Sequence, residues 1–286
     1  METTFVKHDA TVQGAAHANA VSVVDNSAQG LTLQRKANLA NGVVQRVFAG
    51  PLTSNADVEQ QDSDVFEEQK ARFTEAVSLS YDVVYKNGER RRIFLRIGTD
   101  VPDWGDYSKM AQLWVNQLME MSILVPDGLE VYVSNVFTYQ QSFNFGSGKI
   151  SIKPQSIANL LHAGPTFGLN QYNLVANQLS NGDSVKFGAT TMMHELGHIL
   201  HEKSSPTFYR QKTTAAATDK KSFETAPLVS DYAGTKTQAE FVAETFAGLA
   251  NGLLYDENVV TLYWELCGPR CGEIYEAKPG KYGFRK

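Results

Sequence analysis

Hydrophobic and polar positions follow two periods along this chain, and each period predicts a different kind of element. Apolar residues recur every three or four positions in several segments, as they do in amphipathic helices. This period predicts helices at 65–77, 106–124, 189–203 and 237–250, with shorter ones at 154–161 and near 256–266. Between residues 77 and 98, two β-rich runs flank Asn87-Gly88, which predicts a hairpin. Further strands are predicted at 128–140 and 148–152.

Residues 1–60 do not share these periods. They are rich in Ala, Asn, Gln, Ser, Thr and Val, and they hold one aromatic residue before Phe48. Such a composition buries little apolar surface, so we expect a flexible leader followed by a globular domain at 61–286. Within that domain, the polar stretch 204–230 is expected to be a loop, and a polar tail is expected after the last helix.

Composition and charge narrow the function classes. The 286 residues are 42% hydrophobic, which allows a sizeable core, and the formal charge of −5 gives no support for nucleic-acid binding. The cluster of basic residues at 88–96 is typical of the solvated face of a strand. No apolar run has the length of a membrane span, and the first residues lack the apolar core of a secretory signal. Cys267 and Cys271 are too few for a four-cysteine zinc site, so we expect free thiols or one bridge.

The sequence HELGH at 194–198 carries the candidate chemistry. On a helix, His194 and His198 lie one turn apart, so both imidazoles can reach one metal ion. Glu195 is offset to the side, where it can hold a water on that metal, and Gly197 lets another element approach closely. The apolar stripe on the opposite side consists of Met192, Met193, Leu196, Ile199 and Leu200. The competing interpretation is a solvent-facing helix with two surface histidines.

A third ligand is needed, because a catalytic zinc takes three protein ligands and keeps one open position. A metzincin would have a histidine where this chain has Ser204. His201 lies near the other two histidines, but three imidazoles on one short helix would splay. Glu240 and Glu244 remain, one turn apart in an apolar helix where unpaired carboxylates would be costly.

Helix capping is the alternative role for Glu240. Thr237 and Glu240 have the spacing of a capping box, which would use the Glu240 carboxylate at the start of the helix. Thr235 and Gln238 have the same spacing, and with Thr235 as the N-cap residue Glu240 would be free to bind a metal. The residues alone leave both arrangements open.

Taken together, the two segments resemble a known family. HELGH followed by SDYAGTKTQAEFVAETFAGL, residues 230–249, is similar to the zinc-peptidase domain shared by anthrax lethal factor and the Pro-Pro endopeptidases, which are gluzincins. The resemblance is confined to about residues 190–250. It implies an α+β, zincin-like metallopeptidase fold, in which a small, mostly antiparallel sheet packs on the HExxH helix and on a second, glutamate-bearing helix.

The resemblance also implies a cofactor and a set of roles. The residues that would hold Zn²⁺ are His194, His198 and Glu240. Glu195 would act as the general base on a zinc-activated water, and Glu244 would accept a hydrogen bond from a ligand imidazole. The implied activity is that of a zinc-dependent endopeptidase acting on a protein or peptide substrate.

A tyrosine completes the family pattern by donating to the transition state, and the resemblance assigns this role to Tyr232. Tyr232 stands eight residues before Glu240, one more than the family pattern has, which makes Tyr209 a rival. An extended substrate would add to an edge strand of the sheet, for which 148–152 is the predicted candidate.

The leader carries a second, shorter resemblance. LQRKANLANGVVQRVF, residues 33–48, is similar to N-terminal stretches of cargo proteins of bacterial contractile injection particles. It implies a bacterial effector or toxin, secreted without a classical signal peptide and delivered into a target-cell cytoplasm by an apparatus that recognises residues 1–60. Alternatives are a leader that covers the cleft and inhibits, a metal-binding module without catalysis, and an interaction protein with coincidental motifs.

Overall fold

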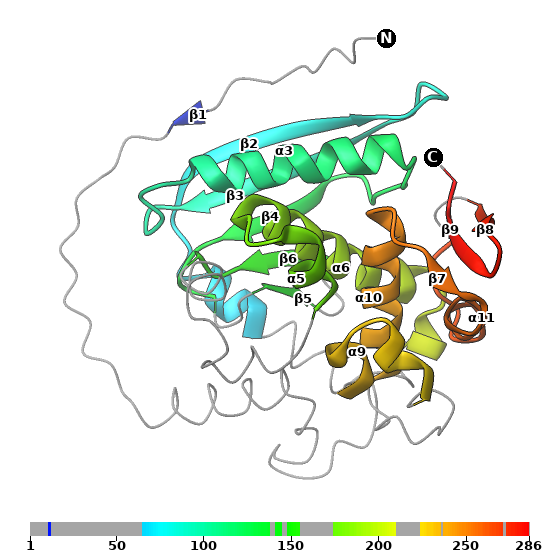
Figure 1. Ribbon diagram of the computed structural model, residues 1–286. Helices are drawn as coiled ribbons and strands as arrows, with labels where there is room; N and C mark the ends of the chain where they lie inside the picture. Colours follow the sequence, from blue (N-terminus) through cyan, green and yellow to red (C-terminus); the bar gives the residue numbers. More distant parts are fainter. Residues whose placement is uncertain are drawn as a thin grey trace.

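The structure is a computed structural model that describes residues 11–12, 65–137, 141–144, 148–154, 174–209, 224–235, 237–270 and 273–285. The predicted leader, apart from two residues, and the helix predicted at 154–161, apart from its first residue, lie outside the described residues. The described chain is α+β, with a mixed six-stranded sheet, a set of helices and a three-stranded sheet near the C-terminus (Figure 1).

The large sheet has the strand order β1-β2-β3-β4-β6-β5. Its strands are β1 (Thr11–Val12), β2 (Glu75–Val84), β3 (Arg90–Gly98), β4 (Leu129–Val133), β5 (Gln141–Asn144) and β6 (Lys149–Ile152). β2 and β3 form the hairpin predicted around Asn87-Gly88, and Gly88 takes the positive φ of 83° that its turn requires.

The sheet differs from the prediction in two details. Three of its five strand pairings are antiparallel, as a mostly antiparallel sheet requires, but β4 runs parallel to both β3 and β6, so the sheet is mixed. A helix connects β3 to β4, and a helical crossover is the usual way to join parallel strands. The predicted edge strand at 148–152 is also not at the edge, because β5 pairs along it.

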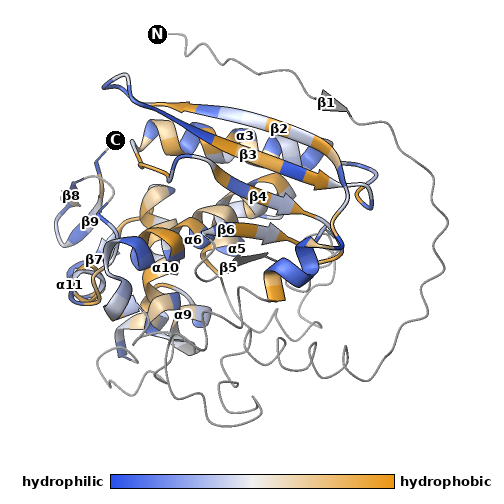
Figure 2. Cartoon of the chain, turned by 180° about the vertical axis from the view of Figure 1, so that it is seen from behind, coloured by the Kyte–Doolittle hydropathy of each residue, from blue (hydrophilic) through white to orange (hydrophobic). Residues whose placement is uncertain are grey.

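One face of the hairpin lies in the core and the other faces outward. The buried positions alternate along both strands: Val77, Leu79, Tyr81, Val83, Ile93, Leu95 and Ile97. On the other face, Arg92 pairs with Asp82 at 3.0 Å, and Arg96 pairs with Glu75 and Glu130. The alternation is visible along β2 and β3 in Figure 2, and it places Arg92 and Arg96 of the basic cluster on the outer face, whereas Arg91 alternates to the other face.

The helix predicted at 65–77 is shorter than expected, because it covers only 65–70 and β2 begins at Glu75. Its Phe66 is buried in a small aromatic cluster with Tyr132 of β4 and Phe137. Tyr132 lies between Val131 and Val133, which belong to the main core, so this cluster covers the opposite face of the sheet.

Helix α6 lies at the centre of the helical layer. The helices are α3 (Gly105–Glu120), α5 (Val175–Ser180), α6 (Ser184–Ser204), α9 (Asp231–Thr235) and α10 (Gln238–Ala250). α6 packs against α3, α5 and α10, and it also contacts β5 (Figure 1). A Cβ on Gly197 would lie 2.9 Å from the Phe246 ring and 3.2 Å from Cα of Ala243. Gly197 therefore permits another element to approach closely, as predicted, and that element is α10.

The C-terminal segment forms a small sheet where the sequence predicted a polar tail. After α11 (Glu257–Glu265), β8 (Ile274–Lys278) and β9 (Lys281–Phe284) form a hairpin, and β7 (Tyr255–Asp256) pairs with β9. Phe284 is buried, and its ring lies 6.3 Å from that of Phe246, so the hairpin packs against α10 through these two residues. Cys267 is half-buried, and Cys271 lies outside the described residues.

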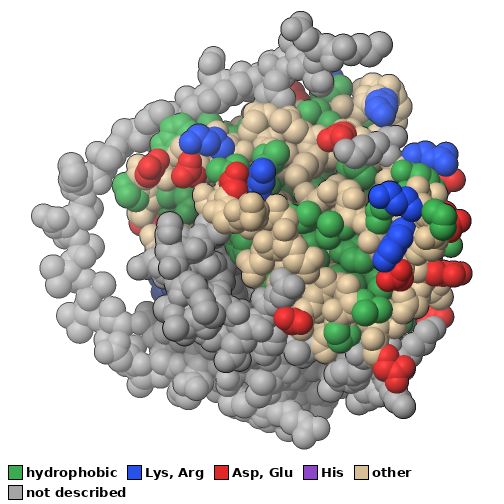
Figure 3. Space-filling model, in the orientation of Figure 1, with side chains coloured by type: hydrophobic (Ala, Val, Ile, Leu, Met, Phe, Trp, Pro, Cys, Tyr) green, Lys and Arg blue, Asp and Glu red, His purple; other side chains and the backbone are tan. Residues whose placement is uncertain are grey.

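On the face shown in Figure 3, Lys, Arg, Asp and Glu side chains are interspersed over the described surface and form no extended field of one sign. Among the described helices, none combines the length and the apolar character that crossing a bilayer requires.

Candidate metal centre

Burial of α6 decides between the two interpretations of HELGH. The helix begins at Ser184, five residues earlier than predicted, because the Asp183 side chain accepts hydrogen bonds from the backbone N–H groups of Val185 and Lys186. Helices α3, α5 and α10 all pack against this helix, and His194, Glu195 and His198 each keep only 7% of their surface exposed. The solvent-facing interpretation is therefore wrong.

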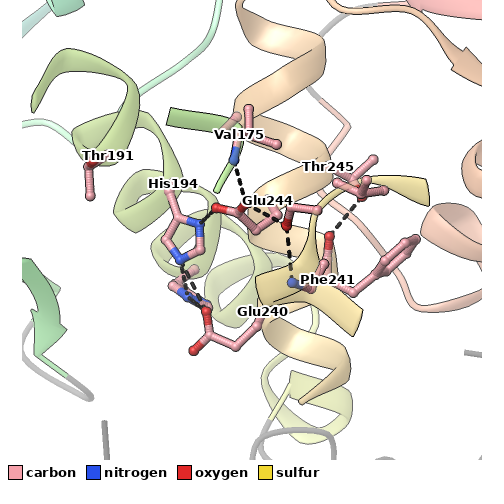
Figure 4. Close-up of polar contacts among 12 residues, drawn as sticks. Val175, Thr191, His194, Glu240, Phe241, Glu244 and Thr245 are labelled. Atoms are coloured by element: carbon pink, nitrogen blue, oxygen red, sulfur yellow. Dashed lines mark hydrogen bonds and ion pairs between the residues drawn. The ribbon is translucent and has the colours of Figure 1, made fainter. Parts of the chain in front are cut away.

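Three side chains from two helices converge at the centre of this region (Figure 4). Oε2 of Glu240 lies 3.1 Å from Nε2 of His194 and 3.2 Å from Nε2 of His198, and the two nitrogens are 3.1 Å apart. Among the described residues, these three form a group that could hold a metal ion. Ligand atoms around a tetrahedral zinc, each about 2.0–2.1 Å from the ion, lie about 3.3 Å apart, so the triangle has the dimensions of such a site.

The hydrogen-bond chemistry of the triangle also favours a cation. Nδ1 of His194 faces Oε1 of Glu244 at 2.8 Å, and an ionised carboxylate can only accept. Nδ1 must therefore carry a proton, which leaves a lone pair on Nε2 of the neutral ring. That lone pair faces the Glu240 carboxylate, which is a second acceptor. A metal ion or an added proton satisfies both groups.

Electrostatics points in the same direction. Burial alone would lower the pKa of His194, but the Glu240 and Glu244 carboxylates outweigh it and hold this pKa well above its ordinary value. Burial alone would raise the pKa of Glu240, but the His198 and His194 rings hold it far below its usual range. The cluster thus attracts positive charge and keeps Glu240 ionised, as metal binding requires.

Glu244 is fixed as a partner of His194. Its Oε2 accepts a hydrogen bond from the backbone N–H of Val175 at 2.9 Å (Figure 4). It also accepts one from the hydroxyl of Ser230 at 2.8 Å. Ser230 in turn accepts from the backbone N–H of Ala233. The predicted contact between Glu244 and a ligand imidazole is present. Val175 and Ser230 were missed, because neither has a sequence signal beyond the position of Ser230 just before a short helix.

Thr237 caps α10, and yet Glu240 remains available for the site. The Thr237 side chain accepts from the backbone N–H of Glu240 at 3.4 Å, whereas Thr235 is the last residue of α9. Only half of a capping box is therefore formed. The Glu240 carboxylate points to the histidines instead of returning to the N-cap residue. Glu240 is therefore available for a metal, as one of the two alternatives expected, but the N-cap residue is Thr237 and not Thr235.

The two tyrosines take different places. The Tyr209 hydroxyl lies 3.2 Å from Nδ1 of His198, on the side of the ring away from the nitrogen that faces Glu240. It therefore supports a ligand and does not point at the metal position. The ring of Tyr232, on α9, lies 6.2 Å from the ring of His194 and is half-buried. Tyr232 thus borders the site, as its assigned role requires.

His201 is outside the metal group. It is fully buried, and its Nε2 lies 2.8 Å from the carbonyl oxygen of Leu266, at the end of α11. Its side chain therefore does not face solvent, and the group of described residues that could hold a metal ion consists of His194, His198 and Glu240.

Comparisons of this chain with protein-family profiles, with curated proteins and with solved structures found no match. The class of the site therefore rests on the donor atoms and their geometry.

Proposed function

We propose that this chain is a zinc-dependent endopeptidase of the gluzincin type, similar to the catalytic domain of anthrax lethal factor and the Pro-Pro endopeptidases. The observation that carries the proposal is the convergence of Glu240 of α10 with His194 and His198 of α6. Two histidines and a glutamate form one of the ligand sets of catalytic zinc sites, and zinc suits this mixture of nitrogen and oxygen donors.

Exposure supports a catalytic over a structural site. Structural zinc sites are closed by four protein ligands, whereas the described residues here supply three. The side chain of Glu240 keeps 24% of its surface exposed, against 9% and 8% for His194 and His198. The cluster is thus covered on the histidine side and reachable on the side of Glu240, where a water and a substrate would enter.

In the mechanism we propose, Glu195, Tyr232 and Glu244 each have a separate role. When bound, Zn²⁺ would polarise the scissile carbonyl and lower the pKa of water. Glu195, beside His194 in the buried part of α6, would take the proton of the attacking water and deliver it to the leaving amine. Tyr232 would donate a hydrogen bond to the developing oxyanion. Glu244 would keep the proton of His194 on Nδ1, so that Nε2 presents its lone pair to the ion.

We propose that the substrate is an extended stretch of protein that pairs with β5. This strand is the edge of the large sheet and contacts α6, so a peptide along it would pass close to the motif helix. Backbone pairing with an edge strand gives affinity without much dependence on sequence. The resemblance of residues 33–48 to injection-particle cargo supports delivery of the chain as a bacterial effector or toxin, with residues 1–60 as the loading segment.

The test replaces the general base and keeps the metal ligands. We expect purified Glu195→Gln protein to bind Zn²⁺ and melt like the wild type, but to cleave peptides roughly 10²- to 10⁴-fold more slowly or not at all. Glu202→Gln, on the same helix and half-buried, is the matched control and should cleave normally. The assay compares new N-termini in a proteome treated with each protein, which also reports the residues around the cleavage site.

Three outcomes separate the alternatives. Normal cleavage by Glu195→Gln would refute the assignment of the base. Stoichiometric Zn²⁺ without cleavage by the wild type would favour a metal-binding module without catalysis. A purified wild-type protein that binds no Zn²⁺ would leave only an interaction protein with coincidental motifs.

A further inference from the structure

The two ligand histidines have chemically different partners on their outer nitrogens. Nδ1 of His194 faces the Glu244 carboxylate at 2.8 Å, whereas Nδ1 of His198 faces the Tyr209 hydroxyl at 3.2 Å. An ionised carboxylate can only accept a hydrogen bond, and a phenol hydroxyl can either donate or accept. The proton of His194 is therefore fixed on Nδ1, and that of His198 is free to occupy either nitrogen.

Packing holds the Tyr209 hydroxyl in place. Tyr209 keeps only 2% of its surface exposed, and its ring meets His201 edge to face with centroids 5.1 Å apart. His201 is anchored through Nε2 to the Leu266 carbonyl, and the backbone N–H of Tyr209 bonds to the carbonyl of Ser205 at 2.8 Å. The hydroxyl therefore has few alternative positions, which is the arrangement expected of a group that orients a ligand.

The inner nitrogen of His198 determines what the hydroxyl does. Without a metal, Nε2 of His198 faces Oε2 of Glu240 at 3.2 Å and is best satisfied when it carries the proton. Nδ1 then accepts a hydrogen bond from Tyr209. With a metal, Nε2 must present its lone pair, so the proton has to be on Nδ1 and Tyr209 has to accept it.

From this geometry we propose that Tyr209 is a positioning residue, whose hydroxyl reverses its hydrogen bond with His198 when the metal binds. The number of protons on the imidazole does not change, because Nε2 loses one proton and Nδ1 gains one. The hydroxyl rotates about its own C–O bond, and no heavy atom needs to move. The inference rests on the proposed metal site and does not depend on peptide cleavage.

The first experiment measures Zn²⁺ affinity by competition with a chelator. Tyr209→Phe removes the hydroxyl and keeps the ring that packs on His201, and we expect the Kd for Zn²⁺ to rise roughly 10- to 100-fold. Tyr85→Phe is the matched control, because it deletes another buried hydroxyl, bonded to the Ile123 carbonyl in the hairpin region. Its Kd should equal that of the wild type. Equal Kd values for Tyr209→Phe and the wild type would overturn the role of Tyr209, whereas a wild type that binds no Zn²⁺ would overturn the proposed function itself.

The second experiment needs no variant. In wild-type protein labelled with ¹⁵N-histidine, NMR reports which ring nitrogen carries the proton. We expect the His198 proton to be on Nε2 without Zn²⁺ and on Nδ1 with Zn²⁺. A His198 proton that already occupies Nδ1 in the metal-free protein would overturn the proposed reversal.

Discussion

Single residues in the metal centre would each be unfavourable to bury, and they stabilise one another only as a set. Among the described residues, the Glu244 carboxylate has three partners, which are the His194 ring, the Val175 N–H and the Ser230 hydroxyl. Removing one member of a buried charged pair leaves the other uncompensated, which typically costs about 3–5 kcal/mol. The partners of Glu244 therefore stabilise the fold as well as the candidate metal site.

His201 gives a prediction about pH at this scale. Burial, together with the nearby His198, lowers the pKa of His201 to about 4, although its bond to Leu266 opposes this. Below an unfolded-state pKa of about 6.5, the unfolded chain binds a proton at this position that the folded protein excludes, so stability falls with pH until about pH 4. The pKa difference corresponds to roughly 3 kcal/mol.

The measurement is the free energy of unfolding in the presence of a chelator at several pH values. Wild-type protein should lose roughly 3 kcal/mol more than His201→Gln between about pH 7 and about pH 4. Glutamine serves as the comparison because it can donate to the Leu266 carbonyl without titrating in this range. Parallel curves for the two proteins would contradict the prediction.

At the scale of elements, the spacing between α6 and α10 sets the geometry of the site, and Gly197 determines that spacing. A methyl group at Gly197 would lie 2.9 Å from the Phe246 ring and 3.2 Å from Cα of Ala243. We expect Gly197→Ala to destabilise the protein by about 1–3 kcal/mol through overpacking, and to weaken Zn²⁺ binding because α10 carries Glu240.

Gly105→Ala is the control, because its nearest neighbour would be a side-chain oxygen of Asp103 at 3.6 Å. This change should be neutral or slightly stabilising, since alanine favours helices over glycine. Thermal unfolding and chelator competition on both variants test the prediction. Wild-type stability and affinity in Gly197→Ala would show that the helices tolerate a wider spacing.

The helices of the site could be predicted from the sequence, because local spacing determines them. His194 and His198 at i and i+4, and Glu240 and Glu244 at i and i+4, each define one helical face, and the structure brings the two faces together. The contact of Tyr209 with His198 could not be predicted, because it depends on how the chain turns after α6. The sequence also could not predict that β5 lies outside β6 at the edge of the sheet, because a strand's place in a sheet depends on partners distant in sequence.

At the scale of the whole molecule, the main core lies entirely within the globular domain. Its buried residues extend from Val77 to Phe284 and include residues of the large sheet, of α3, α5, α6, α10 and α11, and of the C-terminal hairpin. None of the described core residues lies before the predicted domain boundary near residue 60, although β1 of the large sheet does.

Deletion of residues 1–60 tests that boundary and the role of the leader together. We expect the shortened protein to keep the melting temperature, the Zn²⁺ content and the peptide cleavage of the full chain, and to lose only delivery into target cells. Cleavage that increases after deletion would show that the leader inhibits the site. A lower melting temperature would show that the leader is part of the domain.

The spacing of Glu240 and Glu244 on one helix has a consequence for how this chain can diverge. A single inserted residue between them would rotate one carboxylate by about 100° and leave either the ion or His194 without its partner. Insertions within 210–223 would change neither the histidine spacing nor the glutamate spacing. Changes of length between α6 and α9 therefore leave both i, i+4 spacings intact, whereas a change of length inside either helix does not.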